Sequence, residues 1–323
     1  MVDPQHRHHD ADESSRDCMD SRNETNATSH VTETHVTETQ DALQTAPEHL
    51  WRSPDQFPCL KRNDIHIWRA SLACSDRQQE CYRSMLSQRE HQRAARLQFE
   101  HLRHRFVACR GMLRALLGRY LAIAPEQIQF IYGAHGKPTL NDSRHPLPLS
   151  FNLSHSNDLA LFAFCRSGAL GVDVEYLRSS VDVVGLSKRF FTAQEHQAVM
   201  SRPAEQRILE FFNIWTCKEA YLKATGEGLA GLQTVEVDIQ ANKSVNLMIL
   251  RQPLLSAMPD PSTLRWQMCQ CWPQERYVGA IALGSLGSQA LTQPLQTQSL
   301  FSQALTNIQT FSYPHDLANF TKK

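Results

Sequence analysis

A short acidic stretch in the middle of this chain has the residue types and spacing of a cation site. In residues 171–175, Gly-Val-Asp-Val-Glu, apolar and acidic side chains alternate with period two. On a β-strand, Asp173 and Glu175 would therefore project from the same face, separated by roughly 6.6 Å of rise. Both carboxylates could then reach one bound ion.

A second stretch, residues 215–228, adds an acid and a base. Glu219 and Lys223 stand four residues apart in a helix-forming segment that ends at Gly226, so they share one helical face. Hard carboxylate oxygens together with an ammonium group suit Mg²⁺ that carries a diphosphate. The two stretches together predict a magnesium and pyrophosphate site.

The elements that must position these residues follow an α+β pattern. Alternation and short apolar runs predict the strands, and apolar residues recurring every three or four positions predict the helices. The expected strands are residues 64–69, 127–132, 149–153, 159–165, 170–175, 235–239, 246–250, 264–271 and 277–283. The expected helices are residues 89–121, 183–189, 192–200 and 205–224.

The order of strands, helix and strands recurs along the chain. It predicts two similar α+β halves in a pseudo-twofold arrangement, each with a mainly antiparallel sheet packed on a long helix, and an active site at the interface. The halves would span residues 57–176 and 177–285. Residues 1–56 are polar and rich in acidic residues, which predicts a disordered tail, and residues 286–323 form a polar C-terminal appendage.

Formal net charge is zero, but the charge is unevenly placed. The segment 89–119 contains eight arginines against only Glu90 and Glu100. Two interpretations stay open, a solvated helix face or a landing site for a polyanion such as a nucleotide phosphate or an acidic protein. Nucleic acid is disfavoured, since no interleaved aromatic residues or known binding motif accompany the arginines.

The cysteines and the N-terminal residues indicate the cellular compartment of the protein. The nine cysteines show no C-x-x-C spacing, which argues against a zinc ribbon or a redox motif. The sequence begins without the basic start and apolar core of a signal peptide, and no apolar run approaches the ~20 residues that cross a bilayer. These features predict a cytoplasmic protein with reduced thiols and no membrane partner.

Five motifs, all in the same order, make the chain resemble the 4′-phosphopantetheinyl transferases of the two-lobed Sfp type. The resemblance covers roughly residues 60 to 285 and leaves both tails aside. The motifs are Gly-Lys-Pro at 136–138, Phe-Asn-Leu-Ser-His-Ser at 151–156, Gly-Val-Asp-Val-Glu at 171–175, Arg-Phe-Phe-Thr-Ala-Gln-Glu at 189–195 and Trp-Thr-Cys-Lys-Glu-Ala-Tyr-Leu-Lys at 215–223.

The resemblance implies a reaction in which the phosphopantetheine arm of coenzyme A passes to a serine of an apo carrier protein, with release of adenosine 3′,5′-bisphosphate. Asp173, Glu175 and Glu219 would ligate Mg²⁺, and Lys223 would contact the diphosphate and steady the leaving group. The general base stays open between Glu219, Glu195 and a metal-bound water, with Glu219 preferred because it lies at the metal. Glu195 has an equally simple explanation as the acid of a capping box.

Further residues match the family's coenzyme A contacts. Lys137 lies in the turn that contacts coenzyme A, and Ser154 with His155 matches the phosphate-binding turn. Arg105 falls where the family has an arginine for the 3′-phosphate, and Arg93 lies near the place of a lysine. The sequence departs from the family at position 90, where an upstream lysine is replaced by a glutamate.

The partners follow from the same resemblance. An acyl or peptidyl carrier protein is expected, with Arg110 or Arg114 in a basic rim that helps to dock it, and two tandem halves predict a monomer. One alternative is a module of the same fold that binds the carrier protein or coenzyme A without transfer. Another is an unrelated Mg²⁺-dependent nucleotide enzyme such as a kinase, against which the absence of a Gly-x-x-x-x-Gly-Lys-Ser/Thr loop counts.

Overall fold

The computed structural model describes residues 51–141, 148–166, 168–239, 245–249, 264–286 and 308–314. The helices are α2 Asp76–Ser84, α3 Gln88–Arg96, α4 Glu100–Leu121, α5 Val183–Phe190, α6 Ala193–Met200 and α7 Ala204–Thr225. The strands are β1 Ile65–Ser71, β2 Phe130–Tyr132, β3 Pro138–Leu140, β4 Ser150–Ser156, β5 Leu159–Cys165, β6 Ala169–Tyr176, β7 Val235–Ile239, β8 Val245–Ile249, β9 Leu264–Cys271, β10 Tyr277–Leu286 and β11 Ile308–Ser312. The protein is therefore a mixed α/β structure, in line with the expected class.

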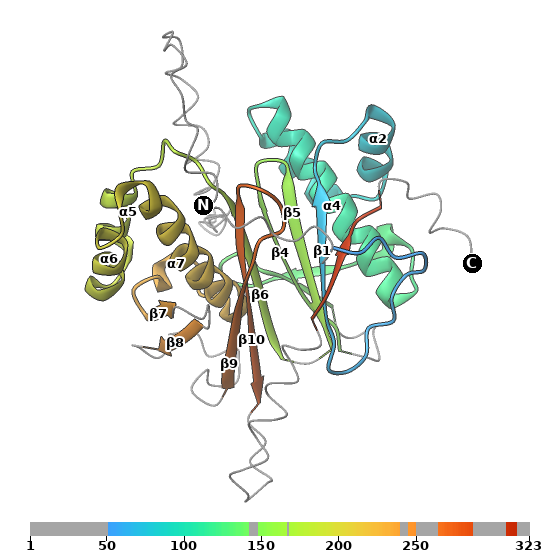
Figure 1. The fold of residues 1–323 in the computed structure, drawn as a ribbon. Coiled ribbons are helices and arrows are strands. Elements are labelled where there is room, and N and C mark those ends of the chain that lie inside the picture. Colours follow the sequence, from blue (N-terminus) through green and yellow to red (C-terminus); the bar gives the residue numbers. More distant parts are fainter. Residues whose placement is uncertain are drawn as a thin grey trace, which may run out of the picture.

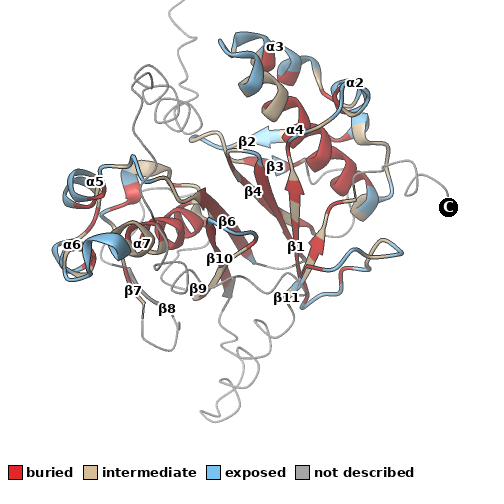
Figure 2. Ribbon diagram, turned by 45° about the horizontal axis from the view of Figure 1, so that its top comes forward, coloured by how far each residue is buried: buried red, intermediate tan, exposed pale blue. Residues whose placement is uncertain are grey.

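The two larger sheets and the two long helices, α4 and α7, form four layers (Figure 1). The pairs β2-β3 and β7-β8 form two smaller sheets. The first sheet has the order β11-β1-β5-β4, and one apolar cluster joins it to α4. The second has the order β6-β10-β9, and another cluster joins it to α7. A third cluster, drawn from β1, β5, β6 and β10, lies between the sheets. Figure 2 shows the buried positions concentrated in the strands, α4 and α7.

The continuous apolar sequence of β5, Leu-Ala-Leu-Phe-Ala-Phe-Cys, follows from this layering. Phe162 and Phe164 point into the cluster with α4, whereas Leu161 and Ala163 point into the cluster between the sheets. All seven residues of the strand are buried. A strand that packs on both faces has no solvent side, and so it loses the polar alternation that marks a half-buried strand.

The expected chain of three successive strands is only partly correct. β4 and β5 pair antiparallel as predicted, but β6 pairs with β10 and belongs to the second sheet. The expected boundary after Tyr176 therefore differs from the structure, in which the second sheet begins with β6. The reason is that β6 packs against α7 on one face, through Gly171, and against the first sheet on the other, through Leu170, Val172 and Val174.

The single helix expected over residues 89–121 is wrong. The chain is extended at Leu97, between α3 and α4, and Arg103 Nη1 donates to the Leu97 and Gln98 carbonyls at 2.9 and 3.2 Å. These bonds satisfy backbone groups that the interrupted helix leaves without partners. The three-to-four-residue periodicity of this segment predicts that Phe99 faces the core, but Phe99 is 37% exposed at the start of α4.

The ends of the chain also differ from expectation. β11 lies within the predicted appendage, yet it pairs in parallel with β1 and buries Phe311 and Tyr313. Trp51, within the predicted tail, is buried between the sheets. Residues 1–50, 287–307 and 315–323 lie outside the described residues, and so do the disorder predicted for residues 1–50 and most of the predicted C-terminal appendage. Within the part that is described, no helix is both long and apolar enough to span a membrane.

Candidate active site

The two sheets are joined at the site by polar side chains of β4. Asn152 Oδ1, Ser154 Oγ and Ser156 Oγ occupy alternate positions of the strand and so lie on one face. They accept hydrogen bonds from three backbone N–H groups of β6 at 2.8, 3.4 and 3.1 Å, those of Val172, Val174 and Tyr176. We call this row the serine ladder. It explains why the motif at 151–156 has polar residues at the alternate positions 152, 154 and 156.

The serine ladder also orients the two carboxylates of β6. Ser154 Oγ donates to Asp173 Oδ1 at 2.8 Å, and Ser156 Oγ donates to Glu175 Oε2 at 2.7 Å. Asp173 is fully buried and Glu175 is 8% exposed. Each serine therefore holds a backbone N–H of β6 and the side chain one residue earlier, which fixes the orientation of both carboxylates.

Helix α7 brings its acid and base to the same place. Lys223 Nζ lies 2.8 Å from Asp173 Oδ1, and Glu219, one turn earlier on α7, is 2% exposed. The close approach of α7 to β6 requires Gly171, where a Cβ atom would lie 1.9 Å from the Ala220 carbonyl oxygen. The glycine of the 171–175 motif thus has a packing role beside the acidic residues.

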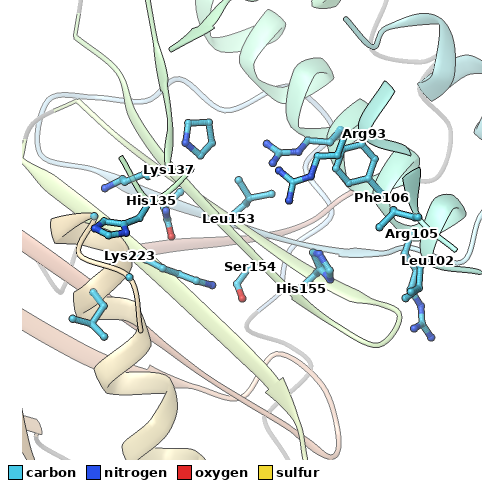
Figure 3. Close-up of a pocket in the computed structure, with 18 of the residues that line it drawn as sticks. Arg93, Leu102, Arg105, Phe106, His135, Lys137, Leu153, Ser154, His155 and Lys223 are labelled. Atoms are coloured by element: carbon cyan, nitrogen blue, oxygen red, sulfur yellow. The ribbon is translucent and has the colours of Figure 1, made fainter. Parts of the chain in front are cut away.

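A pocket next to these carboxylates collects the predicted coenzyme A residues (Figure 3). Its cavity has a volume of about 120 Å³ and is open to solvent. All six residues predicted for this role line it, namely Arg93, Arg105, Lys137, Ser154, His155 and Lys223. Its described lining contains no acidic side chain, so the pocket is suited to a polyanion.

Lys137 is held by the end of α7. Its Nζ donates to the Ala224 carbonyl at 2.7 Å, one of the helix carbonyls that lack an intrahelical partner. Gly136 precedes it with a φ of 80°, which a glycine adopts without strain. Burial lowers the pKa of Lys137 to about 8. The 136–138 turn therefore connects the first half of the chain to α7.

The arginines divide into exposed and buried groups, which corrects the expected basic rim. Arg110 is 3% exposed and lines the pocket, and Arg114 is 1% exposed. Arg114 Nε lies 2.7 Å from Glu90 Oε2, and the same carboxylate accepts the Ser87 backbone N–H at the start of α3. Neither Arg110 nor Arg114 lies at a rim, and Glu90 is a buried structural acid.

Glu195 lies away from the pocket, in a second buried network. Its Oε2 pairs with Lys218 Nζ at 2.5 Å and accepts the Thr192 N–H, while its Oε1 accepts the Val237 N–H at 2.8 Å. Both side chains of the ion pair are fully buried. Glu195 does complete the predicted capping box of α6, but the structure does not bring it to Asp173 or to the pocket lining.

The donor set of Asp173, Glu175 and Glu219 matches the chemistry of Mg²⁺, which prefers oxygen ligands. In the part of the chain that the structure describes, however, no three His, Cys, Asp or Glu side chains already stand in a grouping that could hold a metal ion. Lys223 Nζ is the cation beside Asp173 Oδ1, at 2.8 Å. Ligation by all three carboxylates therefore requires their side chains, and that of Lys223, to reorient.

The structure adds residues that sequence reasoning did not select. Ser156 holds Glu175, His135 lines the pocket, and Asp158 pairs with Arg105. Only Ser156 had a visible signal, because it continues the alternation that begins at Asn152. The others depend on which elements the fold brings together.

Comparisons with known proteins match two successive parts of the chain. A family model described as "4′-phosphopantetheinyl transferase superfamily" matches residues 169–268, and one described as "4′-phosphopantetheinyl transferase, N-terminal" matches residues 70–166. The two matches meet at the connection between β5 and β6, where the second sheet begins.

Three curated relatives illustrate the range of similarity. The 4′-phosphopantetheinyl transferase HetI of Nostoc sp. is 37% identical over 242 residues, which cover 75% of this chain and 97% of HetI. A putative 4′-phosphopantetheinyl transferase of Synechocystis sp. is 41% identical over 150 residues, 46% of this chain and 61% of the relative. The 4′-phosphopantetheinyl transferase Sfp of Bacillus subtilis is 26% identical over 157 residues, 48% of this chain and 67% of Sfp.

Proposed function

Because this chain belongs to the 4′-phosphopantetheinyl transferase superfamily, we propose that it transfers the 4′-phosphopantetheine arm of coenzyme A to a serine of an apo carrier protein, with release of adenosine 3′,5′-bisphosphate. The observation that carries this proposal is the pocket. Its described lining is basic and without acidic side chains, and it adjoins the buried carboxylates of β6 and α7.

The pocket offers two groups of cations, and coenzyme A carries two separate anionic groups. Lys137 and Lys223 lie on one side of Figure 3, and Arg93, Arg105 and His155 lie on the other. We assign the diphosphate to the lysine side, since Lys223 is also in contact with Asp173. The 3′-phosphate then falls to the arginine side, where guanidinium groups suit a phosphomonoester.

Magnesium is the metal that this donor set favours. Asp173, Glu175 and Glu219 would hold it once Lys223 has turned from Asp173 toward the diphosphate. When bound, it would supply charge neutralisation for the diphosphate. The lysine that neutralises Asp173 in the free protein is thereby the group that contacts the leaving nucleotide.

Glu219 is the general base of this proposal, acting directly or through a water molecule. The carrier serine loses its proton to Glu219 as its oxygen bonds to the β-phosphorus, and the bond from that phosphorus to the bridging oxygen of the nucleotide breaks. Lys223 stabilises the negative charge on the departing oxygen. We assign no catalytic role to Glu195, because its oxygens are taken up by Lys218 and by two backbone N–H groups.

The wider properties of the protein belong to the same proposal. We infer two halves related by an approximate twofold axis, one on each side of the connection between β5 and β6, and a monomer that works in the cytoplasm. The carrier belongs to fatty acid, polyketide or nonribosomal peptide synthesis. Neither nucleic acid nor a membrane takes part.

Carrier modification is tested directly by mass. Purified protein, coenzyme A, Mg²⁺ and an apo carrier protein are combined, and the carrier is weighed by mass spectrometry. A Mg²⁺-dependent gain of one phosphopantetheine arm is expected without ATP, which separates transfer from kinase chemistry. Binding of coenzyme A with no gain on carriers from several pathways would instead indicate a binding module.

A further inference from the structure

Arg105 has a defined acidic partner at the edge of the pocket. Its Nε lies 2.9 Å from Asp158 Oδ1, and its side chain, 22% exposed, is part of the pocket lining. The Asp158 side chain is 58% exposed. A carboxylate beside a proposed phosphate site needs an explanation, because its charge opposes the binding of an anion.

Asp158 comes from a turn that is fixed on several sides. It lies in the two-residue connection between β4 and β5, where Asn157 has a φ of 48° and Ser156 pairs with Leu159. The Asp158 carbonyl accepts the Leu72 N–H at 2.7 Å. Its backbone also hydrogen-bonds to Tyr277, a residue of β10. The backbone of Asp158 is therefore held both by Leu72, next to β1, and by Tyr277 of β10.

Among the described residues, the ion pair of Arg105 uses Nε, which leaves its two terminal nitrogens for a bound anion. A guanidinium group is planar and offers its donors in a fixed fork, so holding Nε sets the direction of the two terminal nitrogens. An arginine head that is already oriented loses less conformational freedom when it binds a phosphate. The affinity for phosphate that this orientation adds therefore offsets the affinity that the nearby negative charge removes.

We propose that Asp158 is a positioning residue that presents Arg105 to the 3′-phosphate of coenzyme A. This inference rests on the proposed function, which places coenzyme A in the pocket with its 3′-phosphate toward Arg105. The contrary hypothesis is that Asp158 competes with the phosphate for Arg105. The two hypotheses predict opposite changes in affinity when the carboxylate is removed.

The test compares coenzyme A with 3′-dephospho-coenzyme A as substrates. Asp158→Ala should raise KM for coenzyme A roughly three- to tenfold, as for the loss of one hydrogen bond, and leave KM for the dephospho substrate unchanged. Asp158→Asn keeps an oxygen that can accept from Nε and should stay near wild type. Glu126→Ala, which removes an exposed carboxylate of the same half, is the matched control and should alter neither constant.

Several outcomes would overturn the inference. A lower KM for coenzyme A in both Asp158 variants would establish competition instead, and equal changes for both substrates would establish a general role in the turn. The effect of Asp158→Ala should also vanish in an Arg105→Gln background. If Asp158→Ala does not fold, Asp158→Ser replaces it.

Failure of this inference is distinguishable from failure of the proposed function. If wild-type protein prefers coenzyme A over the dephospho substrate and the Asp158 variants do not change that preference, only the role of Asp158 is refuted. If wild-type protein transfers from neither substrate, the proposed function itself fails.

Discussion

The serine ladder shows how single residues of this protein serve the fold and the site at once. Ser154 Oγ accepts the Val174 N–H and donates to Asp173, so one hydroxyl joins two sheets and orients a carboxylate. Ser156 does the same for Tyr176 and Glu175. A hydroxyl can play both parts because it has one donor and two acceptor lone pairs. A change at either serine therefore acts on packing and on the site together.

Replacing Glu219 by glutamine tests the chemistry with little change of volume. We expect Glu219→Gln to lose at least about a hundredfold in transfer rate, because a neutral amide neither accepts the serine proton nor favours a divalent cation. The rate is measured by the mass of the carrier over time. Calorimetric titration with Mg²⁺ in the presence of coenzyme A should also show weaker metal binding.

The matched control is Glu210→Gln, the same substitution on the same helix. Glu210 pairs with the half-exposed Arg202 and is not part of the pocket lining. Its rate and thermal midpoint should stay near wild type. Transfer at the wild-type rate by folded Glu219→Gln would remove Glu219 from the mechanism.

Lys137 should give the protein a pH-dependent stability. Its pKa is about 8 in the folded protein and 10.5 for the unperturbed side chain, so between these values the unfolded chain binds more protons. The contribution of Lys137 to the free energy of unfolding therefore rises from pH 8 toward pH 10.5. It is constant below pH 8, where the lysine is charged in both states.

Comparison with Lys137→Met isolates this effect from other titrating groups. Urea unfolding of both proteins at pH 7.5 and 9.5 should give a difference, wild type minus variant, that is more positive at pH 9.5. A difference that stays constant across this range would show that the folded pKa of Lys137 is not lowered.

At the scale of elements, the sequence predicts structure well where local signals decide. The capping box of Thr192 and Glu195 correctly begins α6, and Gly226, with a φ of 81°, correctly ends α7. The extended link at Leu97 was not predictable, because its carbonyl is satisfied by Arg103 six residues later. The partner of β6 was not predictable either, since β10 lies about a hundred residues further along the chain.

The residues of the candidate site were likewise only partly predictable from the sequence. The family resemblance selected the six pocket residues, because each lies at or near a position that matches the family's coenzyme A contacts. It could not reveal that Glu195 is buried with Lys218, or that Arg110 faces the pocket while Arg114 faces Glu90. Those distinctions depend on how α4 and α7 are rotated against their sheets.

The buried pair of Glu195 and Lys218 should hold α6, α7 and β7 together. Lys218 Nζ also donates to the Val235 carbonyl at 2.7 Å. Removal of either charge therefore leaves the other charge unpaired in the core. We expect Glu195→Gln to lower the free energy of unfolding by about 3 to 5 kcal/mol, measured by urea denaturation.

The double variant Glu195→Gln, Lys218→Met provides the control for this pair. It should recover part of the lost stability, because no unpaired charge is left. Transfer by the folded fraction of Glu195→Gln should stay near wild type. If Glu195→Gln has wild-type stability but has lost transfer, Glu195 is a catalytic residue.

At the scale of the whole molecule, segments far apart in sequence complete the first sheet. β11 covers the outer edge of β1, and Phe311 packs against Trp68 with ring centroids 4.7 Å apart. The Arg52 N–H donates to Thr310, and the Arg52 carbonyl accepts from Ser312. The polar composition of the segments that contain Arg52 and β11 did not predict this pairing, because a few apolar residues in a polar segment suffice to extend an existing sheet edge.

Two truncations test where the folded unit begins. A chain that starts at Glu48 retains Trp51, which is 8% exposed, packs between the sheets and lies 5.3 Å below the Arg69 guanidinium. We expect it to keep the wild-type free energy of unfolding and transfer rate.

A chain that starts at Phe57, the boundary expected from composition, loses Trp51 and both hydrogen bonds of Arg52 to the β11 region. It should be less stable by about 3 kcal/mol, comparable with loss of a buried tryptophan side chain. Urea denaturation of the two proteins measures the difference. Equal stability would place Trp51 and Arg52 outside the folded unit, whereas a loss confined to the shorter chain would locate its start between residues 48 and 57.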